Sequence, residues 1–307
     1  MEREFSKFIN EITLTPNQSD DAQTKYTNVC KKLYSHYYEG DYDDGKKYLF
    51  GSYKTKTNVR PLTEEQDVDV LFKIPQSTFD KFDQYESNGQ AALLQEIRNI
   101  LKERYPKTDT IKAWSKVVLV KFDEHYHNVE LLPALEQEDG TFLIPNSENG
   151  GSWDTFDPRS EVKRFQTSND NTSGLTRDLA KMLKAWAHNT SSMSYKSCKR
   201  LDDVIEFLDE FYPEGKGSAS YAKIVFEFFD YMSTRCDDDI KSYISTALSR
   251  ARKALENEDS GKFIEASEEW QKVFGPQFPK AEENKREVSE EISSKPVRPW
   301  SNLQKMK

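Results

Sequence analysis

Residues 48–75, YLFGSYKTKTNVRPLTEEQDVDVLFKIP, contain a short apolar run that carries two acids, Asp67 and Asp69, spaced by one residue. The apolar neighbours predict a buried strand, in which residues two apart point to the same face. Two adjacent carboxylates repel each other and are costly to bury unless a cation joins them. The pattern therefore indicates either a cation site on a rigid strand or an edge strand with a solvated acidic face.

The flanking sequence favours the cation site. Gly51 and Ser52 follow an apolar stretch, and a Gly-Ser turn lets backbone N–H groups and a hydroxyl approach phosphate oxygens closely. Downstream, Glu130 stands alone inside the apolar run 129–133. Each element has an ordinary alternative, a plain turn or a single outward-facing Glu. Together they predict a site for phosphates and for Mg²⁺, which takes oxygen ligands.

The bulk composition limits the classes of function. The chain has 307 residues and a formal net charge of −9, and its 18 Phe, 15 Tyr and 5 Trp can build a core. An acidic chain is a poor candidate for gripping a long polyanion over a wide surface, because that requires clustered Lys and Arg. No apolar run has the length of a membrane span, so we expect no membrane contact.

Cysteine and histidine give no sign of a metal or disulfide framework. The three Cys lie far apart in sequence, no CxxC occurs and the four His form no zinc signature. This pattern predicts reduced thiols and a cytoplasmic protein. His125 and His127 are expected to face solvent on a hairpin turn.

Hydrophobic periodicity divides the chain into two halves. The first half is predicted to hold helices at 3–13, 19–38 and 91–105 and strands at 68–74, 114–122 and 128–135. A further short strand is predicted after the Asp-Gly turn within residues 137–146. After Pro145 no strand is expected, and residues 147–159 are predicted to form a loop. Helices are predicted there at 175–188, 201–211, 221–233, 240–256 and 264–274.

This order of elements predicts an α+β fold with a mixed sheet, followed by an all-helical lobe. We place the boundaries at 1–155 for the α+β core with its N-terminal helices and at 156–283 for the helical lobe. Residues 284–307 are charged and rich in Ser and Pro, which predicts a tail.

The combination of Gly-Ser, Asp-x-Asp and a third acid on a later strand resembles the nucleotidyltransferase superfamily that includes DNA polymerase beta, poly(A) polymerase and the oligoadenylate synthetases. Within it, the chain looks like the cyclic GMP-AMP synthase-like enzymes of bacteria, the CD-NTases, over roughly residues 20–280. Their pattern GSYxxxT…DxDV is followed by VDVVPA. Here the second motif reads VELLPA, so Glu130 stands where the family usually has Asp.

A second part of the resemblance lies in the helical half. LTRDLAKMLKAWAHN looks like the family helix whose lysine reaches the donor triphosphate, which implies Lys184 in that role. SMSYKSC looks like the step whose serine binds phosphate and whose aromatic ring stacks on a base. Ser194 and Tyr195 align with it, and Ser197 is a competing register. The alternatives are a solvated lysine on a helix face and a loop aromatic packed on the lobe.

The resemblance implies a nucleotidyltransferase that makes a cyclic di- or trinucleotide second messenger for antiphage, CBASS-type signalling. Asp67, Asp69 and Glu130 would be catalytic and hold two Mg²⁺ ions, with Mn²⁺ as an alternative, and Gly51 and Ser52 would bind the phosphates. ATP or GTP or both would be substrates, no long nucleic acid would be required, and the product would reach a downstream effector. An operon-encoded regulator is a further implied partner. A linear oligonucleotide synthase, an RNA-tailing enzyme and an inactive interaction module remain alternatives.

Overall fold

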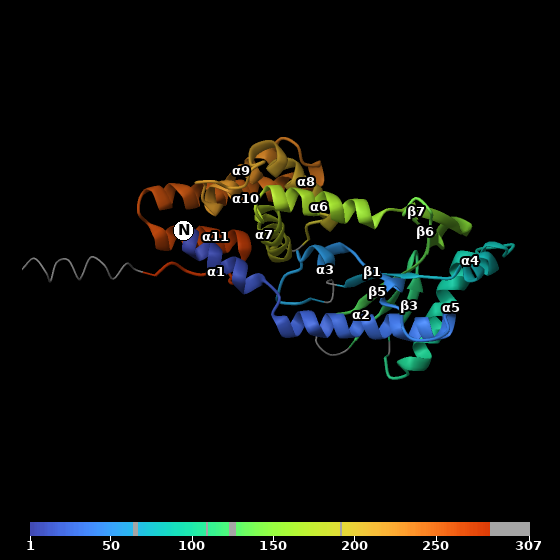
Figure 1. The fold of residues 1–307 in the computed structure, drawn as a ribbon. Coiled ribbons are helices and arrows are strands. Elements are labelled where there is room, and N and C mark those ends of the chain that lie inside the picture. The colour runs from blue at the N-terminus through green and yellow to red at the C-terminus, as the bar shows by residue number, and fades with distance from the viewer. Residues whose placement is uncertain (64–66, 109, 123–126, 191, 283–307) are drawn as a thin grey trace, which may run out of the picture.

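The computed structural model describes residues 1–63, 67–108, 110–122, 127–190 and 192–282. Figure 1 shows two lobes, one built around a sheet and one made of helices, with α6 running between them. This is the α+β architecture predicted from the sequence, with a mixed sheet first and a helical region after it. The predicted tail lies outside the described residues.

The sheet lobe is formed around a parallel pair of strands. The strand order is β1-β2-β5-β4-β3, with β6 paired to β5 and β7 paired to β6. Among the strands of the described residues, β2 and β5 run parallel and the other pairs are antiparallel. The strands are β1 (Lys47–Leu49), β2 (Val68–Lys73), β3 (Ile111–Trp114), β4 (Val117–Val120), β5 (Val129–Glu136), β6 (Phe142–Asn146) and β7 (Ser152–Phe156).

Two helices cover one face of this sheet. α2 (Pro16–Tyr37) and α5 (Gly89–Arg104) contribute Val29, Leu33, Leu93 and Ile97 to a core that also contains alternate residues of the central strands. Those residues are Val68, Val70 and Phe72 of β2 and Val129 and Leu131 of β5. Because side chains alternate along a strand, the residues between them point to the opposite face, which these two helices leave uncovered.

The helical lobe has its own core. It is formed by α7 (Leu175–Asn189), α8 (Ser197–Phe211), α9 (Tyr221–Ser233), α10 (Asp238–Asp259) and α11 (Phe263–Phe274). α6 (Pro158–Asn171) packs against α7 and α8. Among the described residues, no helix is both long and apolar enough to span a bilayer.

The first helix, α1 (Glu2–Ile12), packs into this helical core and not into the sheet lobe with which we grouped it. Phe5 and Phe8 are completely buried and contact the rings of Phe274 and Phe278. The apolar stripe of α1 therefore completes the C-terminal lobe, a contact between distant segments that helical periodicity cannot reveal. The boundary near residue 155 remains a proposal.

The structure corrects three details of the predicted elements. The strand expected at 114–122 is the shorter β4, and Trp114 instead ends β3, a strand that was not predicted; a tight turn in which Ser115 has a positive φ of 50° separates the two. The predicted loop 147–159 contains β7, which pairs with β6, so a strand does follow Pro145. Three helices were not predicted: α3 (Gly51–Thr55), α4 (Gln76–Asp83) and α6. The first two are too short to show a clear apolar period.

Candidate active site

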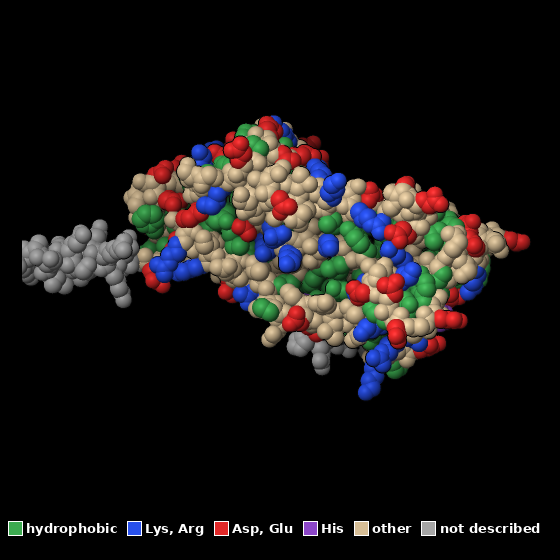
Figure 2. All heavy atoms as spheres, in the orientation of Figure 1, with side chains coloured by type: hydrophobic (Ala, Val, Ile, Leu, Met, Phe, Trp, Pro, Cys, Tyr) green, Lys and Arg blue, Asp and Glu red, His purple; other side chains and the backbone are tan. Residues whose placement is uncertain are grey.

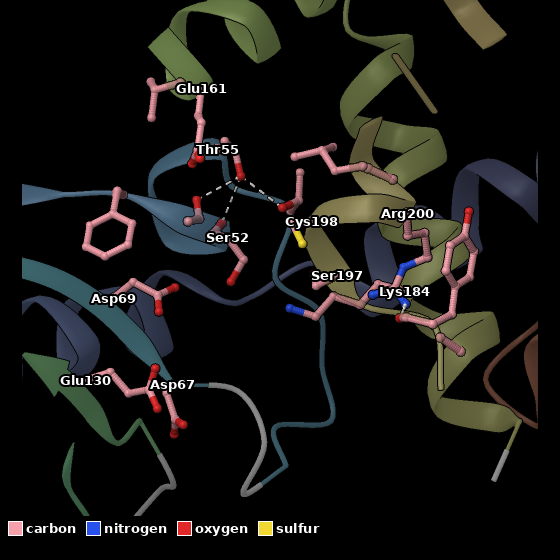
Figure 3. Close-up of a pocket in the computed structure, with 18 of the residues that line it drawn as sticks. Ser52, Thr55, Asp67, Asp69, Glu130, Glu161, Lys184, Ser197, Cys198 and Arg200 are labelled. Carbon is pink, nitrogen blue, oxygen red and sulfur yellow. Dashed lines mark hydrogen bonds between the residues drawn. The ribbon is translucent and has the colours of Figure 1, made fainter. Parts of the chain in front are cut away.

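Three acidic side chains lie on the sheet face opposite α2 and α5. Asp69 of β2 and Glu130 of β5 are direct partners in the parallel register, and Asp67 immediately precedes β2. All three line one cavity of about 620 Å³. Figure 3 shows the three carboxylates on one side of this cavity, with Lys184 and Arg200 on the other side and Ser52 between them. The prediction that Glu130 comes from a strand beside the one carrying Asp69 agrees with this register.

The carboxylates disturb one another's ionisation. Burial, followed by the charge of Glu130, raises the pKa of Asp69 to about 7. Burial also raises the pKa of Glu130, with a further contribution from Asp67, and burial raises the pKa of Asp67. Like charges held in a partly desolvated place disfavour the ionised state. The raised pKa of Asp69 favours a proton, or another cation, at this carboxylate near neutral pH.

The donor set fits a hard divalent cation. Oδ1 of Asp67 is buried and has no hydrogen-bond partner among the described residues, which leaves a carboxylate oxygen available as a ligand. In the described part of the chain, no three His, Cys, Asp or Glu side chains are gathered tightly enough to hold an ion by themselves. Mg²⁺ does not require such a cage, because it is usually bound by one or two carboxylates plus substrate phosphates.

The Gly-Ser turn is the start of a short helix. Gly51 and Ser52 open α3 directly after β1, and the amide of Phe50 donates to the carbonyl of Asp69 at 3.2 Å. The buried Thr55 hydroxyl lies 3.1 Å from the Gly51 carbonyl and 2.9 Å from the hydroxyl of Thr57. These bonds fix the turn beside the acids and leave Ser52 lining the cavity.

Gly51 is required by both backbone and space. Its φ is +62°, a conformation that L residues with a side chain rarely adopt. A Cβ atom built on Gly51 would lie 2.2 Å from Oδ2 of Asp69. The turn at Gly51 can thus approach the Asp69 carboxylate only because glycine has no side chain.

The helical lobe supplies positive charge to the same cavity. Lys184, in the middle of α7, is only 9% exposed, so it is not the solvated helix-face lysine that was the alternative. Burial, followed by the charge of Arg200, lowers the pKa of Lys184 to about 8. Burial, followed by the charges of Lys184 and Arg200, lowers the pKa of His188 to about 4. This imidazole, which also lines the cavity, is therefore neutral at pH 7.

Ser194, Tyr195 and Ser197 have different surroundings. Ser197 begins α8 and lines the cavity, whereas Ser194 is exposed and does not line it. Tyr195 lines the cavity with 8% of its surface exposed, its hydroxyl bonded to Asp203 and its ring against Trp186. This geometry favours Ser197 over Ser194 as the serine that would contact phosphate. The stacking role of Tyr195 remains a proposal.

Sequence reasoning missed several residues that line the cavity. Arg200 and Cys198 come from the start of α8, His188 from the end of α7 and Glu161 from α6. His188 is four residues after Lys184, which places both on one helix face. That spacing is a signal in the sequence. Nothing in the sequence places Glu161 here, because α6 itself was not predicted.

His127 was predicted wrongly to face solvent. Its side chain is completely buried, and Nδ1 lies 2.6 Å from Oδ2 of Asp21 on α2. Asp21 thus ties the start of β5 to the helix that covers the other sheet face. His125 lies outside the described residues.

The fold and the acidic cavity define a nucleotidyltransferase of the polymerase-beta-like class. A family model described as the Second Messenger Oligonucleotide or Dinucleotide Synthetase domain matches residues 1–169, and the chain belongs to this family. The chain is therefore a nucleotidyltransferase that synthesises a second-messenger oligonucleotide or dinucleotide. Enzymes of this kind are generally metal-dependent.

Individual relatives agree with this assignment. A probable cyclic nucleotide synthase of Bacillus cereus strain VD146 is 25% identical over 284 residues, covering 78% of this chain and 84% of that protein. CdnC of E. coli MS115-1, in complex with HORMA-deltaN, has a TM-score of 0.63 at 16% identity, covering 91% of this chain and 98% of that one. Vibrio cholerae DncV, a cyclic AMP-GMP synthase in complex with the linear intermediate 5′ pppA(3′,5′)pG, has a TM-score of 0.66 at 12% identity, with coverage of 88% and 93%. At these identities the two structures establish the fold alone.

Replacing Gly51 with Ala should abolish pyrophosphate release from NTPs and lower the thermal unfolding midpoint, because the new methyl group would displace Asp69. Gly40→Ala is the matched control: Gly40 also has a positive φ, of 80°, but a Cβ there meets nothing within 4 Å. Both variants carry the strain of a positive φ at a residue with a side chain. The difference between their activities and unfolding midpoints therefore reports the effect of the clash with Asp69. Equal activity in the two variants would contradict this role for Gly51.

The metal-free protein should lose stability as the pH rises from about 4, the pKa of Asp in an unfolded chain, to about 7. The folded state then holds a proton on Asp69 that the unfolded state has released, so deprotonation favours unfolding. Thermal midpoints measured in a chelator should show this decline, and Mg²⁺ added at neutral pH should raise the midpoint. Asp69→Asn should flatten both responses, while Asp259→Asn, at an exposed position on α10, should preserve them. If the thermal midpoint of Asp69→Asn fell with pH as steeply as that of the wild type, Asp69 would not be the group responsible for the decline.

Proposed function

We propose that this chain joins NTPs into a cyclic di- or trinucleotide, using Asp67, Asp69 and Glu130 to hold two Mg²⁺ ions. The observation that carries this proposal is the register of β2 and β5, which sets Asp69 directly beside Glu130 in a cavity that also contains Lys184. When bound, divalent ions would activate the acceptor hydroxyl and neutralise the departing pyrophosphate.

Each residue has a proposed task in this reaction. Gly51 and Ser52 cradle the terminal phosphates of the donor nucleotide, because both residues line the cavity at the start of α3. Lys184 places a positive charge across from the carboxylates and draws the triphosphate toward the helical lobe. Ser197 adds a hydroxyl, and Tyr195 offers part of its ring to a base. Two sequential transfers, the second intramolecular, would close the ring.

The related proteins support the substrate class. DncV is a cyclic AMP-GMP synthase seen with a linear intermediate, which is the species expected between two transfers. By this analogy we propose ATP and GTP as substrates. CdnC is seen in complex with HORMA-deltaN, which supports a protein regulator as a partner. A role in antiphage defence, with a downstream effector that binds the product in the cytoplasm, completes the proposal.

The surface charge favours activity without a long nucleic acid. Figure 2 shows basic side chains in several small groups, one of them near the middle of the face in view, with acidic side chains interspersed among them. A duplex bound over a wide surface would require a continuous basic stripe. A linear-product enzyme remains the alternative within the class, and an inactive interaction module is disfavoured because the three carboxylates are retained.

The assay that tests the proposal contains the four NTPs, Mg²⁺ and no DNA or RNA. Wild-type protein should release pyrophosphate, and mass spectrometry should identify a cyclic product. Asp69→Asn and Glu130→Gln should each reduce the rate at least about 100-fold, because each removes a charge held for the metals. Asp139→Asn, at a turn acid outside the cavity, should leave the rate unchanged. Full activity of Glu130→Gln would show that the third ligand is elsewhere, and a purely linear product would favour the alternative.

A further inference from the structure

A buried arginine, Arg200, lies in the cavity without a carboxylate to neutralise it. Near the start of α8, it is only 7% exposed. Its Nη1 donates a hydrogen bond to the carbonyl of Tyr195 at 3.0 Å, and its guanidinium carbon lies 5.6 Å from the Tyr195 ring centroid. Among the described residues, no Asp or Glu forms an ion pair with Arg200 within 4.0 Å.

The nearest acid along the helix is engaged elsewhere. Asp203, one turn after Arg200, is bonded through its carboxylate to the hydroxyl of Tyr195 and to the ammonium group of Lys199. Because the Asp203 carboxylate is bonded to Lys199 and Tyr195, it does not pair with Arg200. Within the described part of the chain, the guanidinium is bonded through Nη1 alone, although it has five N–H donors, and Arg200 lines the cavity.

Arg200 also lies beside a second buried cation. Lys184 forms no ion pair within the described residues, and the charge of Arg200 disfavours its protonated state. Figure 3 shows both side chains on the same side of the cavity, opposite the acids. Two like charges removed from water are costly to keep together unless an anion joins them. The arrangement is therefore suited to a ligand with several negative charges.

We infer that Arg200 is a second phosphate-binding residue of this site and contacts the terminal phosphates of the donor nucleotide together with Lys184, an inference that rests on the proposed function. The planar guanidinium matches two phosphate oxygens at once, which an ammonium group does not. Arg200 lies against Tyr195 on the side of the cavity opposite the three acids (Figure 3). By this inference it would hold the end of the triphosphate remote from the reacting phosphorus.

The experiment compares the binding of a non-hydrolysable ATP analogue with that of AMP, in the presence of Mg²⁺, by isothermal titration calorimetry. Arg200→Gln should weaken the analogue about 10- to 100-fold, the usual effect of losing a hydrogen bond to a charged group. Its affinity for AMP should change less than about twofold, because AMP lacks the terminal phosphates. Arg164→Gln is the matched control, since this exposed arginine on α6 pairs with Asp202 and Glu206.

A second variant guards against loss of the fold. Arg200→Lys keeps a cation and its packed stem, yet it should still reduce the preference for the triphosphate over AMP by about threefold or more, because Lys cannot bind bidentately. If Arg200 only holds the backbone of Tyr195 in place, both variants should weaken the binding of the analogue and of AMP by the same factor. Both should also lower the thermal unfolding midpoint of the nucleotide-free protein. That result would overturn the inference. Failure of the wild-type protein to bind the analogue would instead reject the proposed function itself.

Discussion

The parallel pairing of β2 with β5 is the constraint on which the site depends. It places Asp69 beside Glu130, so two carboxylates that repel each other are fixed on neighbouring strands. The strands cannot separate to relieve this repulsion, because Val68, Val70, Val129 and Leu131 anchor their other face in the core beneath α2 and α5. The hydrophobic effect on one face thus holds in place an electrostatic conflict on the other.

The two lobes carry opposite charges to one cavity. The sheet lobe contributes the carboxylates, and α7 and α8 of the helical lobe contribute Lys184 and Arg200. The lobes are tied together close to the site: Nε of Arg177, on α7, donates to the carbonyl of Thr55 on α3 at 3.1 Å. A bound triphosphate with its metals would satisfy both groups of charges at once. Nucleotide and metal binding should therefore be mutually dependent in this protein.

The prediction of the fold succeeded where local periodicity was strong. The helices α7, α9 and α11 end within about two residues of their predicted limits, which is the normal uncertainty of helix ends. β7 was missed because its sequence, SWDTF, is polar and follows two glycines, so only its pairing with β6 reveals it as a strand. α1 was predicted as a helix, but its partner lies more than 250 residues away in sequence.

The sequence by itself determined the class of chemistry. The spacing of Asp67 and Asp69 predicts that both carboxylates point to one side of the chain, and the apolar residues around Glu130 predict a second buried strand. The tertiary structure alone decided which residues face these acids. Lys184 and Arg200 are separated from Asp69 by more than 100 residues, and their burial depends on how the helical lobe packs. Local patterns specify which face of a strand or helix a side chain occupies, whereas only the assembled cores determine which faces meet.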